Sequence, residues 1–255
     1  MVTVEHNCRS YEIPGVLDEL TPGQYKSYLF LAVMLRRGVL DEMGFRAKLL
    51  AELMGLGVDI TDFKPDVAKG LIAQLGVLDG FLDENGPITA TGRNLLPEFA
   101  GWKARVGDML NGLAFGEFVE ALTLMGRLDD DEESQQAVLN ELARLLYSPP
   151  EGKPDAEVPA LVAVHSLTFF TSVFNMIRKE PIGISGEMIN FSIIFKPVPG
   201  VPSKADDHTG WHGIAMEVAS SGVFGTLKDV NGTPLWDVLL YLYRAKFDLL
   251  HEKRK

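Results

Sequence analysis

Hydrophobic residues recur at a helical spacing along most of this chain. A period near 3.6 residues, typical of a helix with one buried face, predicts helices around 22–37, 41–54, 65–82, 115–125, 160–177 and 208–221. A further helix is expected after the acidic residues 129–133, and a long last helix from Pro234 onward. No repeat of fixed length is present, which argues against a repeat solenoid.

Strand-like alternation is confined to short stretches. Residues 2–5 and 10–13 flank Asn7-Cys8-Arg9 and predict a small β-hairpin. Strict alternation over 189–195 predicts a lone extended strand within the proline-containing segment 181–207. The expected fold is therefore mainly α: a multi-helix bundle with a small N-terminal β-hairpin and a proline-rich irregular segment before the last helices.

Capping residues mark several helix starts. Thr21, Pro22 and Gln24 combine an N-cap, a first-turn proline and the third-position side chain of a capping box. Asp41 predicts the next N-cap, and the acidic run 129–133 suits the positive end of a helix dipole better than an interaction tail. Because residues 28–35 are apolar on every face, the first helix is expected to be surrounded by others.

A polar, proline-containing stretch at 148–158 is the best candidate for a boundary inside the chain. It predicts an N-terminal subdomain over 1–147, with the hairpin and the first helices, and a C-terminal helical subdomain over 159–255. The two subdomains could also pack as one domain.

Composition excludes several functional classes. Of the 255 residues, 46% are hydrophobic, which is enough to fill a sizeable core, and the formal net charge is -11. An acidic surface repels phosphate backbones and anionic lipid, so neither nucleic acid nor membrane is an expected partner. The single cysteine, Cys8, allows no internal disulfide, and the chain does not open on a secretory leader, so we expect a cytoplasmic protein.

One stretch has an alternative membrane interpretation. Residues 160–177 are apolar for nearly the length of a membrane span and precede Arg178-Lys179. The stretch also carries several polar residues, among them His165, Ser166 and Asn175, which a span seldom tolerates. The central helix of a water-soluble core is therefore the favoured interpretation.

The candidate catalytic motifs are weak. His208 and His212 would share one helix face, but Thr209 stands where a zinc protease motif needs glutamate, and Asp206 and Asp207 are equally suited to capping. Neither a phosphate-binding glycine loop nor a dinucleotide fingerprint occurs. We therefore expect no enzyme activity, no bound metal and no cofactor, and keep a metal-dependent enzyme using the His208/His212 region as an alternative.

The last helix carries the more informative signal, because it has two adjacent apolar stripes. A monomer core could absorb both, or one could be left for a partner helix or a second copy of the chain. The alternating 189–195 stretch has the same ambiguity, since an edge strand can pair within the fold or with another chain. The residues predicted to bind a protein partner are Trp236, Leu240, Tyr243, Phe247, Phe191 and Phe195.

Three sets of short stretches are spread over most of the chain: YEIP at 11–14 with LTPGQY at 20–25; NLLP at 94–97 with FGEF at 115–118 and LLY at 145–147; and SGVFG at 221–225 with LWDVL at 235–239. Together they resemble tail assembly chaperones and related tail-morphogenesis proteins of tailed bacteriophages and prophages. The resemblance implies a helical, non-enzymatic factor in the cytoplasm of a bacterial host, which holds the tape-measure protein before tail polymerisation. The length and the 181–207 segment depart from the simplest such chaperones, which leaves a structural, virion-associated component as an alternative.

Overall fold

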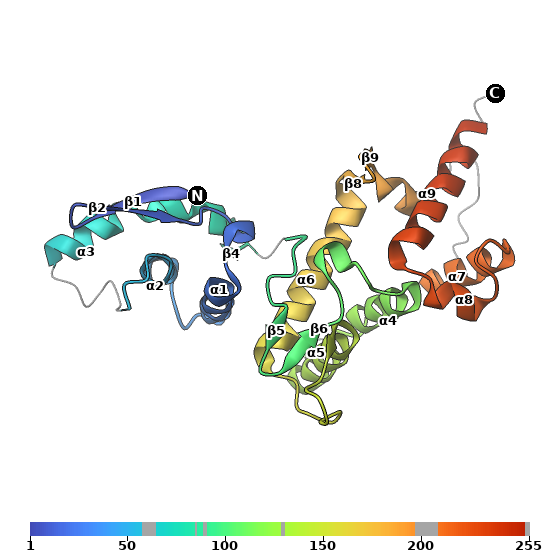
Figure 1. Cartoon of the computed structure of the whole chain (residues 1–255), viewed down its shortest axis with the longest axis horizontal. Helices are drawn as coiled ribbons and strands as arrows, with labels where there is room; N and C mark the ends of the chain where they lie inside the picture. The colour runs from blue at the N-terminus through green and yellow to red at the C-terminus, as the bar shows by residue number, and fades with distance from the viewer. Residues whose placement is uncertain (58–64, 85, 89–90, 129–130, 197–208, 253–255) are drawn as a thin grey trace.

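Helices dominate the structure, a computed structural model that describes residues 1–57, 65–84, 86–88, 91–128, 131–196 and 209–252. The mainly α prediction is confirmed. Figure 1 shows the elements up to β4 on one side of the molecule and the elements from β5 to α9 on the other. Their strands form only small antiparallel sheets of two or three strands.

The chain opens with the predicted hairpin. Strands β1 (Val2–His6) and β2 (Arg9–Ile13) pair antiparallel, with Val2 opposite Ile13. Asn7 and Cys8 form the turn with φ angles of 50° and 58°, as a two-residue hairpin turn of the favoured twist requires. Cys8 is therefore displayed at the exposed tip.

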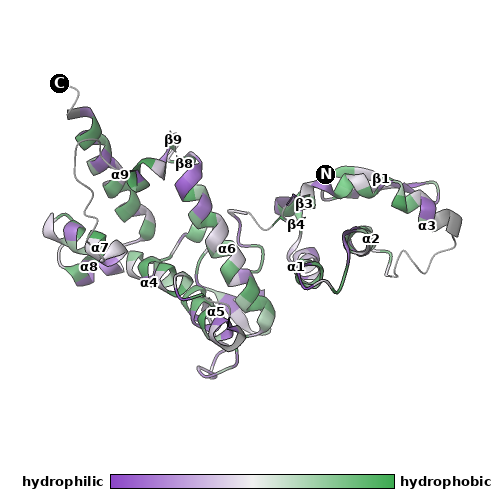
Figure 2. Cartoon of the chain, turned by 180° about the vertical axis from the view of Figure 1, so that it is seen from behind, coloured by the Kyte–Doolittle hydropathy of each residue, from purple (hydrophilic) through white to green (hydrophobic). Residues whose placement is uncertain are grey.

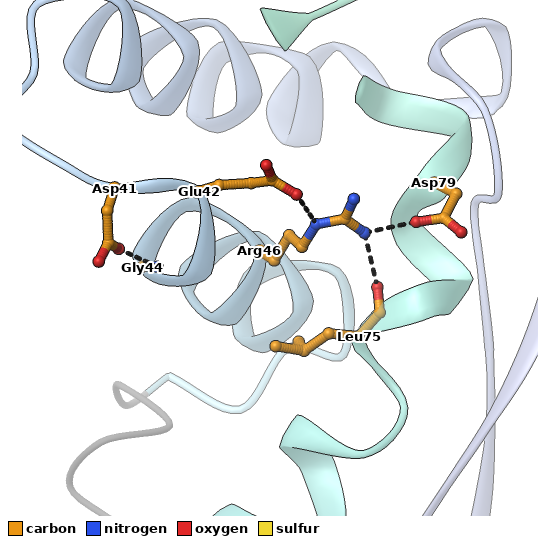
Figure 3. Close-up of polar contacts among 6 residues, drawn as sticks. All are labelled: Asp41, Glu42, Gly44, Arg46, Leu75 and Asp79. Carbon is orange, nitrogen blue, oxygen red and sulfur yellow. Dashed lines mark hydrogen bonds and ion pairs between the residues drawn. The ribbon is translucent and has the colours of Figure 1, made fainter. Parts of the chain in front are cut away.

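The next two helices begin where their caps predict. Thr21 caps α1 (Pro22–Arg36) in a reciprocal capping box with Gln24. The Asp41 carboxylate accepts a 2.7 Å hydrogen bond from the Gly44 amide at the start of α2 (Glu42–Leu53; Figure 3). The expectation that α1 is surrounded by other helices is wrong, because Phe30 is 60% exposed.

The predicted helix over 65–82 is also wrong in its second half. Helix α3 ends at Ile72 (Pro65–Ile72), and a 3-10 helix, η3 (Leu75–Phe81), leads into the short strands β3 (Leu82–Asp83) and β4 (Gly86–Pro87). Gly80 of η3 lies against the backbone of Gly15, because a Cβ at Gly80 would lie 2.1 Å from the Gly15 carbonyl oxygen. The chain is thus held against the segment that follows the hairpin.

Arg46 fastens η3 to α2 (Figure 3). Its guanidinium pairs with Glu42 at 2.9 Å on its own helix and with Asp79 at 2.6 Å on η3. It also donates to the Leu75 carbonyl at 3.2 Å. The two carboxylates are exposed, so the ion pairs contribute little stability by themselves, while the planar guanidinium fixes the geometry of the contact.

The second half of the chain begins with short strands. A three-stranded sheet, which the sequence did not predict, joins β5 (Glu98–Phe99), β6 (Trp102–Ala104) and β7 (Tyr147–Ser148). A 3-10 turn, η4 (Asp108–Leu110), precedes α4 (Phe115–Met125). Helix α5 (Glu132–Leu146) begins at Asp131, whose carboxylate caps the Ser134 amide, so that residue of the acidic run is a helix start as predicted.

Helix α6 (Ala160–Lys179) lies inside the second half and contacts α1, α5 and η5. It is the one helix of the described segments with the length and composition to cross a membrane, but 56% of its apolar window is buried within the protein. Its polar groups have partners there, such as the Ser166 hydroxyl, which donates to the Val162 carbonyl. Helix α4, which lies beside α6, is also largely hydrophobic (Figure 2).

The strand predicted over 189–195 is wrong beyond Ile189. Strands β8 (Ile182–Ile184) and β9 (Glu187–Ile189) form a small hairpin, and η5 (Phe191–Phe195) is a 3-10 helix. The Asn190 side chain accepts a hydrogen bond from the Ser192 amide and turns the chain, so that Phe191 is fully buried. The proline-containing residues that follow, 197–208, lie outside the described residues.

Three helices complete the chain: α7 (Gly210–Ser220), α8 (Leu227–Gly232) and α9 (Leu235–Glu252). The sequence missed α8, although Thr226 and Asp229 form its capping box. The segment 148–158 connects α5 to α6, which pack against each other. The predicted division into subdomains there stays a prediction.

A buried histidine joins the two sides of the molecule. The Tyr25 hydroxyl on α1 lies 2.9 Å from Nδ1 of His165 on α6, and the Asn94 side-chain oxygen lies 3.1 Å from Nε2. Because that oxygen can only accept, Nε2 carries the proton and the tyrosine donates to Nδ1. His165 is fully buried, stacked on Phe169 at 5.5 Å, and burial lowers its pKa from 6.5 to about 3.

The lowered pKa predicts a pH-dependent stability. Above pH 6.5 the imidazole is neutral in both states; below it, the unfolded chain takes up a proton that the folded protein refuses until about pH 3. As the pH is lowered from 6.5 toward 3, His165 alone should therefore lower the free energy of unfolding by about 1.4 kcal/mol per pH unit. Between pH 7 and pH 5, the free energy of unfolding measured with urea should depend less steeply on pH for His165→Gln than for the wild type. If the two proteins show the same dependence on pH, His165 is not held in a neutral, buried state.

Candidate functional site

The first half of α9 is used inside the protein. The Trp236 indole N–H donates to the Met109 carbonyl at 3.0 Å, and its ring lies 5.7 Å from that of Phe191. Tyr243 contacts Phe191 from the next turns, at 5.8 Å. Phe191 is thus covered by Trp236 and Tyr243, and all three are among the six residues predicted to bind a partner.

Phe195 belongs to a second aromatic cluster. Its ring lies 6.0 Å from Phe174 and 5.8 Å from Trp211, with the Arg178 guanidinium 5.9 Å above it. Such contacts fix the end of η5 between α6 and α7. The structure therefore brings Phe191, Trp236 and Tyr243 together, and places Phe195 in a separate cluster.

The second half of α9 offers the more accessible surface. Tyr243 and Phe247 lie 5.9 Å apart, and Phe247 stacks on His251 at 3.9 Å, which makes an aromatic ladder along one face. Phe247 is half-buried and Leu249 is 48% exposed. Figures 1 and 2 show α9 extending away from the helices at its base, with hydrophobic residues continuing toward its C-terminal end.

Among the described residues, the buried His165 is the strongest candidate for a general base, but it is enclosed. His165 has two hydrogen-bond partners, as a general base would, but no solvent or substrate reaches a fully buried imidazole. Of the predicted histidine pair, His212 is exposed on α7, whereas His208 lies outside the described residues. Within the described ranges, no group of three His, Cys, Asp or Glu side chains is placed to hold a metal ion.

The described residues also form concave sites that the sequence did not suggest. One is a groove of about 490 Å³ between α1, α5 and α6, near Phe99 of β5. Another, about 360 Å³, lies between η4, the β8–β9 turn and Trp236. Both are formed by residues from several elements, so periodicity within one element could not reveal them.

Comparison with known proteins gave no relative: the chain matches no family model, no curated protein and no solved structure.

The contacts of α9 predict opposite results for two aromatic truncations. Trp236→Ala removes an internal hydrogen bond and a ring packed on Phe191, and should lower the free energy of unfolding by about 3 kcal/mol. Phe247→Ala, in the accessible half, should cost about 1 kcal/mol or less. Urea denaturation of both variants measures this. Equal, large losses would mean that the whole of α9 belongs to the core.

Proposed function

We propose that this protein is a non-enzymatic protein-binding factor in the assembly of a phage tail or phage-like particle. It holds a helical partner such as a tape-measure protein, and acts in the cytoplasm of the bacterial host. The observation that carries the proposal is the aromatic ladder of Tyr243, Phe247 and His251 along one face of the second half of α9, where Phe247 is only partly buried by its own chain.

The physical support lies in how helices recognise one another. An apolar helix face in water is costly unless it is covered, and a partner's amphipathic helix can cover it along its length. Aromatic side chains commonly carry a large share of interface energy, and Tyr243 and Phe247 lie one turn apart on such a face. The Tyr243 ring packs against Phe191, and this contact orders the tyrosine side chain before a partner binds.

Two alternatives have different requirements. A structural component of a phage or phage-like particle would self-associate stably and remain in the finished particle. A metal-dependent enzyme using the His208/His212 region would need further ligands, and His212 is at present the one described member of that pair.

Co-expression with the tape-measure protein of the same phage or prophage tests the proposal. The wild type should retain it on an affinity column, and Tyr243→Ala together with Phe247→Ala should weaken retention by about tenfold or more while far-ultraviolet circular dichroism stays unchanged. The matched control is Met216→Ala on α7, which also removes an exposed apolar side chain. If the wild type does not retain the tape-measure protein, the proposed function is wrong.

The metal alternative has its own test. A ligand that binds only the folded state raises the thermal midpoint by mass action, so zinc or manganese should leave the midpoint unchanged if neither is bound. A reproducible rise that His208→Ala and His212→Ala abolish would instead favour the metal-dependent enzyme.

A further inference from the structure

The groove between α1, α5 and α6 has the shape of a trough along a helix. Lys26, Phe30, Val33 and Arg37 line one wall, and their spacing of four, three and four residues puts them on a single stripe of α1. At a rise of 1.5 Å per residue the stripe is about 16 Å long, which is about three helical turns. A cation stands at each end and two apolar residues lie between them.

The opposite wall is mostly apolar, with Gln136 of α5 as its polar side chain. Leu139 of α5 and Leu161 and Val164 of α6 face the groove, together with Ala160 and Ala163. Alanines permit a close approach of another backbone. Phe30 is 60% exposed at the edge of the trough, and a large, exposed aromatic ring beside a groove is a typical anchor for a bound helix.

The charge of the groove is opposite to that of the protein. The chain carries a formal net charge of -11, yet the groove is lined by two cations and no carboxylate. Among the described residues, neither Lys26 nor Arg37 takes part in an ion pair, and Lys26 instead lies 5.4 Å above the Phe99 ring. The N-terminus of α6, which no side chain caps, adds a partial positive charge at the same place.

We propose that this groove binds an amphipathic helix of a partner protein, about three turns long, with apolar side chains on its inner face and carboxylates near both ends. The separation of the two cations favours this occupant. A fatty acid has one anionic group and would satisfy one cation, whereas a helix can place carboxylates opposite both. The proposal depends on the groove alone and goes beyond the surface of α9, so either site can fail without the other.

The test uses a synthetic, fluorescein-labelled helical peptide of about 14 residues, with leucines on one face and a glutamate at each end of that face. A second peptide has lysines in place of the glutamates. Fluorescence anisotropy with the full chain should show binding of the acidic peptide at least about tenfold tighter than the basic one. The affinity of the acidic peptide should fall as salt rises, since the charges are partly exposed.

Variants locate the site. The double variant Lys26→Glu, Arg37→Glu should bind the acidic peptide at least about tenfold more weakly than the wild type, and so should Phe30→Ser. The control for net charge is Lys69→Glu, Lys228→Glu, which reverses two exposed lysines elsewhere; the control for apolar surface is Met216→Ser. Both controls should bind like the wild type, with unchanged thermal melts, and Phe247→Ala should also bind normally.

Four results would overturn the proposal. Equal binding of the acidic and basic peptides, or an unchanged affinity in the charge-reversal variant, would show that the groove does not select an acidic helix. Binding of oleate that Phe30→Ser abolishes, without peptide binding, would assign the groove to a lipid. A concentration-dependent dimer in sedimentation, lost in Phe30→Ser, would assign it to a second copy of the chain.

Discussion

The neutral imidazole of His165 is the point at which distant parts of the chain meet. It accepts a hydrogen bond from Tyr25 of α1 and donates one to Asn94, which precedes the three-stranded sheet. A buried polar group is costly unless each of its hydrogen-bonding atoms has a partner, and here both ring nitrogens have one. The side chain therefore requires α1, α6 and the 94–96 segment to be in place together.

The same network continues toward the last helix. Asn94 donates its amide N–H to Asp108 at 2.8 Å and its side-chain NH2 to the Val106 carbonyl at 2.9 Å. The neighbouring Met109 carbonyl accepts from Trp236 at 3.0 Å. These hydrogen bonds and the Asp108–Met109 backbone thus connect α1 to the base of α9, while the C-terminal half of α9 extends beyond them.

The network also sets the groove. Tyr25 precedes Lys26 on α1, and His165 follows Val164 on α6, so the hydrogen bond between them joins two of the helices that line the groove. Both candidate binding surfaces, the groove and the second half of α9, consequently rest on one set of internal hydrogen bonds.

Local features were predictable from the sequence and tertiary ones were not. Thr21, Asp41 and Asp131 cap helices as predicted, because capping acts within four residues. The 189–195 alternation failed because the Asn190 side chain turns the backbone and Phe191 is needed in the core.

The groove and the His165 network were not predicted for the same reason. Their residues come from separate segments of the chain: Tyr25 and Asn94, for example, lie 140 and 71 positions from His165. The sequence identified the last helix as apolar with two stripes. It could not show that Phe191 and Trp236, two of the six predicted binding residues, pack on each other.

Nitrogen NMR of the histidine side chains tests the central claim most directly. The chain has five histidines. The account predicts that one of them keeps its neutral, Nε2-protonated form from pH 8 to pH 5, and that its resonance disappears in His165→Gln. A spectrum in which all five titrate near pH 6.5 would contradict the buried network and, with it, the joining of the two sides of the molecule.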